Sequence, residues 1–188
     1  MNDSFSFFLK SIQEKEKAEA AEKSKFNPAE RIKYFQNLVR DFFGILEGNW
    51  FKEAVDEGLM EIEKSEVLIT EEALGQYKTE KRRLLFGNEV IDFVPIGTIM
   101  LGTDARIDMY YKQNKVMFVH VGENVRSASD LIIIHVNHVN GEPVKKAKPA
   151  TPVKKVWKLT YGNARTIYTE ATAQSVQQLI MDLVNAKA

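Results

Sequence analysis

The fold is decided by residues 81–168, a run of short strand-like segments that begins KRRLLFGNEVIDFVPIGTIMLGTDARIDMYYKQNKVMFVHV. Arg82–Phe86 and Glu89–Val94 have the composition of strands, and Gly87-Asn88 between them suits a two-residue hairpin turn. Pro95 has no N–H to donate to a sheet, so the chain should bend there. This stretch therefore predicts an antiparallel sheet built from hairpins.

Further strands and a closing helix are expected toward the C-terminus. Leu131–Val136 is apolar apart from His135, which is typical of a strand buried on both faces. Val156–Tyr161 and Ala164–Tyr168 predict another hairpin around a Gly-Asn link. The last helix, capped by Thr169 or Thr172, should face inward through a spaced apolar set: Val176, Leu179, Ile180, Leu183 and Val184.

Two helices are predicted before the strands. Asn27 is a favourable N-cap, Pro28 suits the first helical position, and Glu30 is placed for a capping box. The broad apolar face that follows comprises Ile32, Phe35, Leu38, Val39, Phe42, Phe43 and Leu46. A weaker stripe over Trp50–Glu63, carried by Phe51, Val55, Leu59 and Ile62, predicts a second helix and so a helical hairpin.

The first 25 residues are expected to form an arm. Phe5, Phe8, Leu9 and Ile12 fall at helical spacing, and the polar stretch to Lys25 has nothing to bury. One interpretation is a docking segment for a protein partner or for self-association. The alternative is a helix that packs on its own domain or frays at the terminus.

Together these segments predict an α+β protein divided into an arm (1–25), a helical hairpin (26–65) and an antiparallel β domain (66–188). The β domain is expected to be a small barrel or sandwich closed by the C-terminal helix. This order of elements is similar to that of pleckstrin-homology-like domains, although no sequence motif is shared. Order of elements alone does not license a function.

Composition excludes several classes of protein. The 188 residues contain 44% hydrophobic residues, enough for a core, and 26 basic against 26 acidic side chains, a balance that argues against coating of nucleic acid. The absence of cysteine excludes disulfides, thiol nucleophiles and zinc–thiolate sites. No apolar run is long enough for a membrane span and the N-terminus lacks a signal-peptide pattern, so a cytoplasmic location is expected.

The best candidate for chemistry lies in a predicted hairpin of Ala105–Tyr111 and Lys115–Val121. If its turn is Lys112-Gln113-Asn114, Arg106 lies opposite His120 and shares a face with Asp108. One interpretation of such a face is a small hydrolase or transferase, with His120 as the acid–base group and Asp108 orienting it. The alternative is an ordinary cross-strand salt bridge beside an incidental histidine.

Other chemical sites are weaker. His135 and His138 are three residues apart and would point to opposite faces of a strand, so no metal site and no cofactor is predicted. Residues 140–155 form a lysine-rich loop that is a candidate for binding phosphates or acids: Lys145, Lys146, Lys148, Lys154 and Lys155. Charge that merely keeps the loop soluble is the alternative.

The sequence therefore favours a non-catalytic intracellular interaction module, such as an adaptor, an immunity-type inhibitor or a complex subunit. The first alternative is an enzyme that uses Arg106, Asp108 and His120. The second is nucleic-acid binding through the lysine-rich loop.

Overall fold

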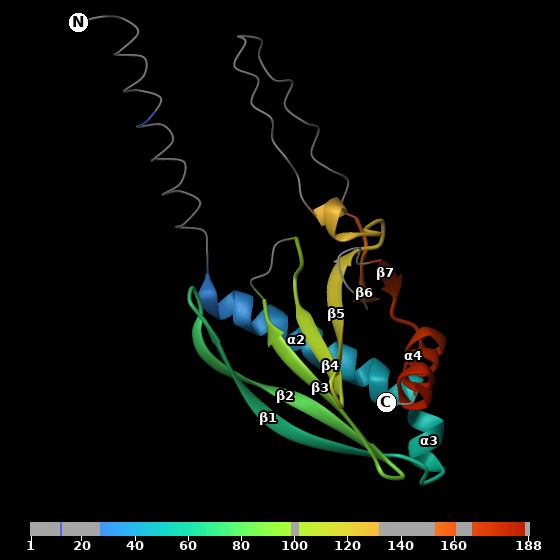
Figure 1. The fold of residues 1–188 in the computed structure, drawn as a ribbon. Helices are drawn as coiled ribbons and strands as arrows, with labels where there is room; N and C mark the ends of the chain where they lie inside the picture. The colour runs from blue at the N-terminus through green and yellow to red at the C-terminus, as the bar shows by residue number, and fades with distance from the viewer. Residues whose placement is uncertain (1–11, 13–26, 99–101, 132–152, 161–166, 187–188) are drawn as a thin grey trace, which may run out of the picture.

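The protein consists of one antiparallel sheet with a long helix across one face and a shorter helix at one end (Figure 1). The computed structural model describes residues 12, 27–98, 102–131, 153–160 and 167–186. The helical segments are α2 (Pro28–Ile45), the π-helical turn η1 (Leu46–Trp50), α3 (Lys52–Asp56), the 3₁₀ turn η2 (Ala128–Leu131) and α4 (Ala173–Asn185). The strands are β1 (Glu61–Glu71), β2 (Gly75–Phe86), β3 (Glu89–Gly97), β4 (Arg106–Tyr111), β5 (Asn114–Gly122), β6 (Lys155–Thr160) and β7 (Tyr168–Glu170).

Helix α2 begins where its sequence predicts. The Asn27 side chain accepts hydrogen bonds from the backbone N–H groups of Ala29 (3.1 Å) and Glu30 (3.3 Å), and Pro28 is the first helical residue. These bonds satisfy donors that the first turn of a helix otherwise leaves unpaired. The predicted start of the helix is therefore confirmed.

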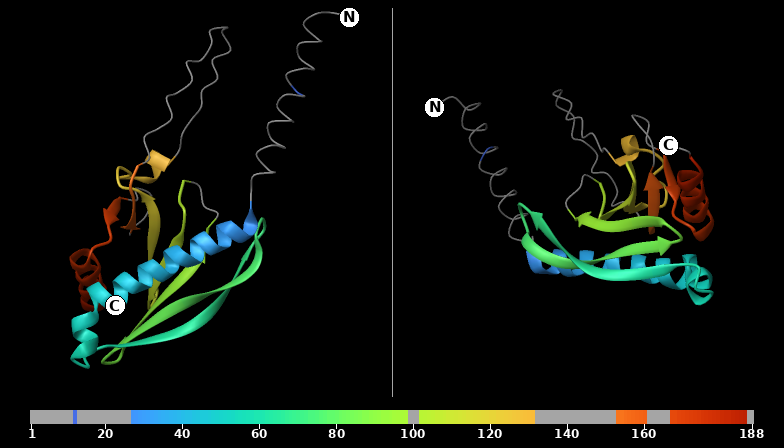
Figure 2. Two further views of the ribbon diagram at one scale, coloured as in Figure 1. Left: turned by 180° about the vertical axis from the view of Figure 1, so that it is seen from behind. Right: turned by 60° about the horizontal axis from the view of Figure 1, so that its bottom comes forward.

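The core lies between α2 and the concave face of the sheet (Figure 2). Phe42, in the last turn of this helix, is fully buried. Its ring centroid lies 4.8–6.1 Å from those of its aromatic neighbours, which are Phe43, Trp50, Phe93, Phe118 and Trp157. Val176 and Ile180 of α4 belong to the same core, so both helices and the sheet share one apolar interior.

The strands of the described residues form a single seven-stranded sheet in the order β1 to β7, with antiparallel neighbours throughout. The predicted α+β class and antiparallel sheet are confirmed. The predicted barrel or sandwich is wrong, because this sheet is open and the described residues form no second sheet. The apolar face of α2 buries the concave side of the sheet, so closure is not needed to cover the core.

The second predicted helix is mostly absent. Its helical part is limited to α3, and Leu59 of the expected apolar stripe is 65% exposed. Strand β1 begins at Glu61 and pairs with β2 over its whole length, from Glu61 opposite Leu85 to Glu71 opposite Gly75. Cross-strand pairing outweighs the weak local helical pattern. Residues 72–74 form the tip of this long hairpin.

Two other local predictions are confirmed. Phe86 pairs with Glu89 around Gly87-Asn88, and Gly87 has the positive φ (+55°) that a tight hairpin turn requires. Thr172 caps α4 by accepting a hydrogen bond from Ser175 N–H (3.2 Å). The link predicted at Gly162-Asn163 lies outside the described residues.

Replacing Phe42 with alanine is expected to destabilise the protein by about 3–5 kcal/mol, because the change leaves a cavity among the core aromatic rings. Chemical denaturation followed by tryptophan fluorescence would measure the loss. Leu68→Ala is the control, since Leu68 is 56% exposed on β1 and its truncation should cost about 0.5 kcal/mol or less. Equal losses for the two variants would contradict the placement of α2 on the sheet.

Candidate functional site

The register of the β4–β5 hairpin determines which ionisable side chains meet. Tyr111 pairs with Asn114, so the turn has two residues, Lys112 and Gln113, instead of the predicted three. Lys112 adopts a left-handed conformation (φ +51°), which such tight turns require. Because side chains alternate along a strand, this shift of one residue moves every β5 side chain to the opposite face relative to β4.

As a result, the sheet separates Arg106 and Asp108 from His120. Arg106 lies opposite Val119, and its guanidinium forms two bonds to the Asp108 carboxylate, from Nε to Oδ1 (2.5 Å) and from Nη2 to Oδ2 (2.6 Å). Hydrogen bonding to Asp108 raises the pKa of Arg106. The three residues predicted to form one catalytic face are therefore not brought together.

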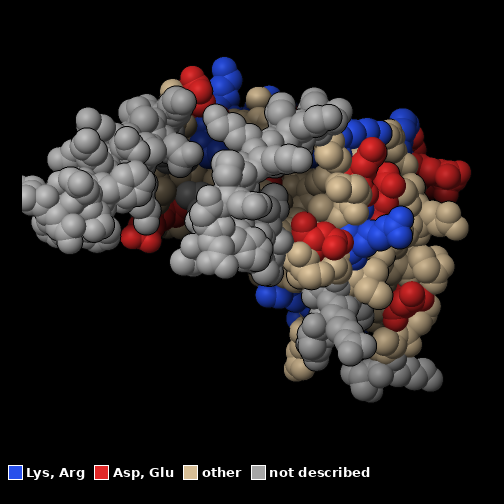
Figure 3. All heavy atoms as spheres, turned by 90° about the horizontal axis from the view of Figure 1, so that it is seen from above, with Lys and Arg blue, Asp and Glu red and all other residues tan. Residues whose placement is uncertain are grey.

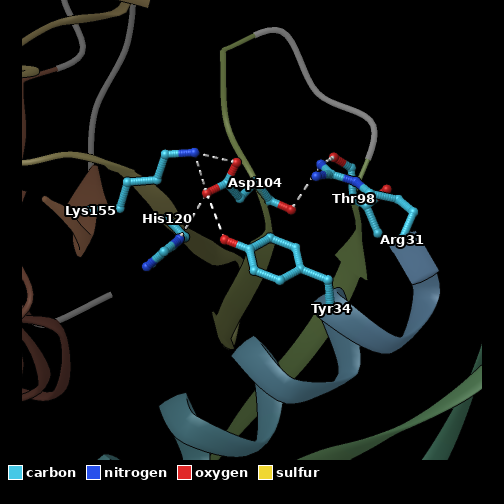
Figure 4. Close-up of polar contacts among 6 residues, drawn as sticks. All are labelled: Arg31, Tyr34, Thr98, Asp104, His120 and Lys155. Atoms are coloured by element: carbon cyan, nitrogen blue, oxygen red, sulfur yellow. Dashed lines mark hydrogen bonds and ion pairs between the residues drawn. The ribbon is translucent and has the colours of Figure 1, made fainter. Parts of the chain in front are cut away.

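His120 instead belongs to a polar cluster centred on Asp104, which precedes β4 (Figure 4). Asp104 Oδ2 lies 3.2 Å from His120 Nδ1, 2.7 Å from Lys155 Nζ and 3.2 Å from Tyr34 Oη, while Asp104 Oδ1 lies 2.8 Å from Lys155 Nζ. Lys155, predicted to bind phosphates or acids, is thus paired with a carboxylate of its own chain. We call Tyr34, Asp104, His120 and Lys155 the Asp104 cluster.

Backbone contacts fix the segment that carries Asp104. Asp104 N–H donates to His120 O, and His120 N–H donates to Ala105 O, each at 3.0 Å. Arg31 of α2 donates from Nη2 to Thr98 O (2.9 Å) and to Asp104 O (3.2 Å), at the two sides of the β3–β4 connection. Helix α2 and the sheet therefore position the cluster jointly (Figure 4).

Glu71, at the end of β1, also holds the start of the β3–β4 connection. Thr98 N–H donates to both carboxylate oxygens of Glu71, each at 3.1 Å. Gly97 has φ +156°, and a Cβ there would lie 2.9 Å from the Glu71 side chain, so glycine permits this close approach. The end of β3 is therefore anchored to β1 as well as to α2.

The cluster shifts the pKa values of its members. Burial lowers the pKa of His120, and Asp104 only partly offsets this effect, so the imidazole is neutral at pH 7. Burial alone would raise the pKa of Asp104, but its hydrogen bond and charge interaction with Lys155, followed by those with His120, lower it below the ordinary value. The ionised Asp104 accepts hydrogen bonds only, so His120 carries its proton on Nδ1.

A groove of about 300 Å³ lies beside the Asp104 cluster, between α2 and the β6–β7 end of the sheet. Trp50 comes from η1, where Phe51 N–H donates to Leu46 O (3.1 Å) across a wide π-helical turn. Gln177 of α4 donates to Trp50 O (2.6 Å) and holds this turn in place. We call this cavity the α2–β6 groove; its lining is Leu38, Asp41, Ile45, Trp50, His120, Lys155, Val156, Trp157, Glu170 and Ala171.

Several predicted sites lie outside the described residues. Of the proposed docking stripe, Phe5, Phe8 and Leu9 lie there, whereas Ile12 is helical and 39% exposed. Among the predicted loop lysines, only Lys154 and Lys155 are described, and Lys154 is exposed. The strand expected over residues 131–136, with His135, also falls largely outside, as does His138.

Charges of both signs are interspersed over the described part of the face in Figure 3. Within the described residues, no group of three or more His, Asp or Glu side chains is placed to hold a metal ion. No helix of that part of the chain is long and apolar enough to cross a membrane. Comparisons of the chain with protein-family models, curated proteins and solved structures found no match.

Sequence reasoning missed the Asp104 cluster and the groove. It named His120 as a candidate, but it gave no role to Asp104 or to Tyr34, which are 70 positions apart in the chain. The polar face of α2 was the available signal, since Arg31, Tyr34 and Asp41 recur beside its apolar stripe. The contacts of these three side chains can be identified only once α2 is packed against the sheet.

Removal of Asp104 and removal of Lys155 should shift the pKa of His120 in opposite directions. Asp104→Asn removes the carboxylate that raises the pKa of His120, so that pKa should fall further below 6.5. Lys155→Met removes a cation that lowers it, so the pKa should rise. NMR titration of the imidazole signals would measure both changes, and shifts of the same sign would contradict the cluster.

The same titration has a consequence for stability. Because the folded-state pKa of His120 is depressed, its neutral form contributes stability that is present above the unfolded-state pKa and is lost as the pH falls through the folded-state pKa. His120→Gln should remove this contribution. The slope of unfolding free energy against pH, measured from pH 7 downward, should therefore be shallower in this variant than in the unmodified protein.

Proposed function

We propose that this protein is a non-catalytic interaction module and that the α2–β6 groove is its recognition site. The observation that carries the proposal is the groove itself, in which Leu38, Ile45 and Val156 lie beside two tryptophans and several ionisable side chains. Binding sites typically combine a mainly apolar lining with a few polar groups. Tryptophan is also enriched among the residues that dominate interface energetics.

The state of the charged residues supports binding over catalysis. Arg106 is bonded to Asp108, and Lys155 is bonded to Asp104. A general acid or base must exchange a proton with the substrate, and a carboxylate already held by three donors is poorly suited to that role. These pairs instead give the walls of the groove a fixed shape, which lowers the entropic cost of binding.

A second candidate function is a hydrolase or transferase that uses His120 alone as its base. His120 lines the groove, Asp104 orients its Nδ1, and the other ring nitrogen points away from Asp104 in Figure 4. A neutral, oriented imidazole has the properties of a general base. Arg106 and Asp108 have no part in this version, because they lie on the other face of the sheet.

The remaining predictions have less support. Nucleic-acid binding through the lysine-rich loop would have to proceed without Lys155, which is paired with Asp104. Docking through Phe5, Phe8, Leu9 and Ile12 stays a proposal for the arm, and a cytoplasmic location stays a prediction. The groove is preferred as the recognition site because its lining is fully specified by described residues.

Site-specific photo-crosslinking would test the proposal. A diazirine side chain introduced at Ile45, which is 38% exposed in the groove wall, should form a discrete adduct in the cell of origin. The matched control is the same side chain at Leu68, which is more exposed (56%) but lies on β1, away from the groove. The adduct is expected at position 45 and absent at position 68.

Equal adducts at both positions, or none at either, would overturn the groove as a recognition site. The enzyme alternative has a separate signature. Turnover of a panel of ester and phosphoester substrates that is lost in His120→Gln but retained in Arg106→Gln would favour catalysis by His120. Catalysis lost in both variants would point instead to a general effect on folding.

A further inference from the structure

The α2–β6 groove contains acidic groups that have no partner within the described residues. Asp41 lies on α2 between Leu38 and Ile45, at helical spacing that turns all three toward the groove. Glu170, at the end of β7, also belongs to the lining. Neither carboxylate has a hydrogen-bond or ion-pair partner in the described part of the chain, although Asp41 is close enough to act electrostatically on His120.

The basic groups of the groove do not compensate for these acids. The charge of Lys155 is already matched by Asp104, because Lys155 Nζ lies 2.8 Å from Asp104 Oδ1 and 2.7 Å from Asp104 Oδ2. His120 is neutral at pH 7 because burial lowers its pKa. The groove therefore has a net negative lining, and a ligand that enters it with a positive charge gains an interaction that an anion or a neutral ligand does not.

The aromatic residues of the groove also favour a positively charged ligand. Trp157 is held in place by Phe42 (ring centroids 4.8 Å apart) and by His120 (5.3 Å). Trp50 is held by Phe42 (5.4 Å) and through the bond from Gln177 to its carbonyl oxygen. Indole rings attract organic cations through their negative faces and also pack well against aliphatic chains.

The size of the groove limits the occupant. About 300 Å³ lies at the lower end of the range of small-molecule sites, which is enough for one long side chain but not for a helix. A long aliphatic stem that ends in a positively charged head matches both parts of the lining, since Leu38 and Val156 are apolar and Asp41 is acidic. Lysine has this shape and charge.

We propose that the α2–β6 groove binds a lysine side chain of a partner protein, with the ammonium group at Asp41 and the aliphatic stem against Trp50 and Trp157. The inference rests on the proposed function and names the chemistry of the partner at that site. An acidic partner is disfavoured by Asp41 and Glu170. A purely apolar partner is disfavoured because it would cover these carboxylates without compensating the loss of their water.

An NMR titration of the full-length protein would test this inference. The probe is Nα-acetyl-lysine methylamide, and the matched control is the norleucine compound, which keeps the aliphatic stem and lacks the ammonium group. The indole N–H signals of Trp50 and Trp157 should shift saturably with the lysine probe and much less with the norleucine compound. Equal shifts with both compounds, or none with either, would overturn the proposal.

Isosteric substitutions then test which carboxylate binds the ammonium group of the probe. Asp41→Asn should raise the dissociation constant of the lysine probe about five-fold, the effect of a partly exposed ion pair of about 1 kcal/mol, and Glu170→Gln should raise it less. Asp182→Asn on α4 is the control, since it removes the same charge outside the groove and should leave binding unchanged. Unchanged binding in Asp41→Asn, or equal weakening in Asp182→Asn, would overturn the role of Asp41.

The two proposals can fail separately. A crosslinked adduct at Ile45 combined with no response to the lysine probe would retain the groove as a recognition site and reject lysine as its occupant. Saturable lysine binding that depends on Asp41, combined with no adduct at Ile45, would support the cation preference and reject the proposed interaction in the cell.

Discussion

The packing of α2 against the concave face of the sheet is the interaction on which the rest of the structure depends. Phe42 lies at its centre, fully buried, with aromatic neighbours from η1, β3, β5 and β6. These rings meet at tilted and edge-to-face angles, the arrangements that aromatic quadrupoles favour. A sheet that is open at both ends obtains its core from this helix, which explains why it need not close into a barrel.

The Asp104 cluster is the polar counterpart of that packing. Tyr34 comes from α2, Asp104 from the segment before β4, His120 from β5 and Lys155 from β6, so their contacts join four separate parts of the chain. Arg31 adds contacts to the backbone on both sides of the β3–β4 connection. Partly buried polar groups are costly when left unpaired, and here each acidic or basic member of the cluster has a partner.

The α2–β6 groove lies where the apolar packing of α2 and the Asp104 cluster both end. The apolar packing of α2 continues as far as Trp50, where the π-helical turn redirects the chain, and the Asp104 cluster stops at Lys155. Between them the structure leaves a cavity lined by Trp50 and Trp157, both largely buried, beside Asp41. The groove thus combines a rigid aromatic wall with an uncompensated charge, which are the two properties that the proposed lysine recognition uses.

The sequence by itself determined the local features. Asn27 and Pro28 specify the start of α2, Gly87-Asn88 specifies a hairpin turn, and one of two nearby threonines, Thr172, caps α4. Each of these acts through contacts within a few residues. Tertiary structure alone decided the register of β4–β5, since a two-residue turn requires Lys112 to adopt a positive φ that its side chain does not signal. It also decided that residues 61–71 form a strand and that Tyr34 meets Asp104, because pairing and burial over long sequence distances outweigh local patterns.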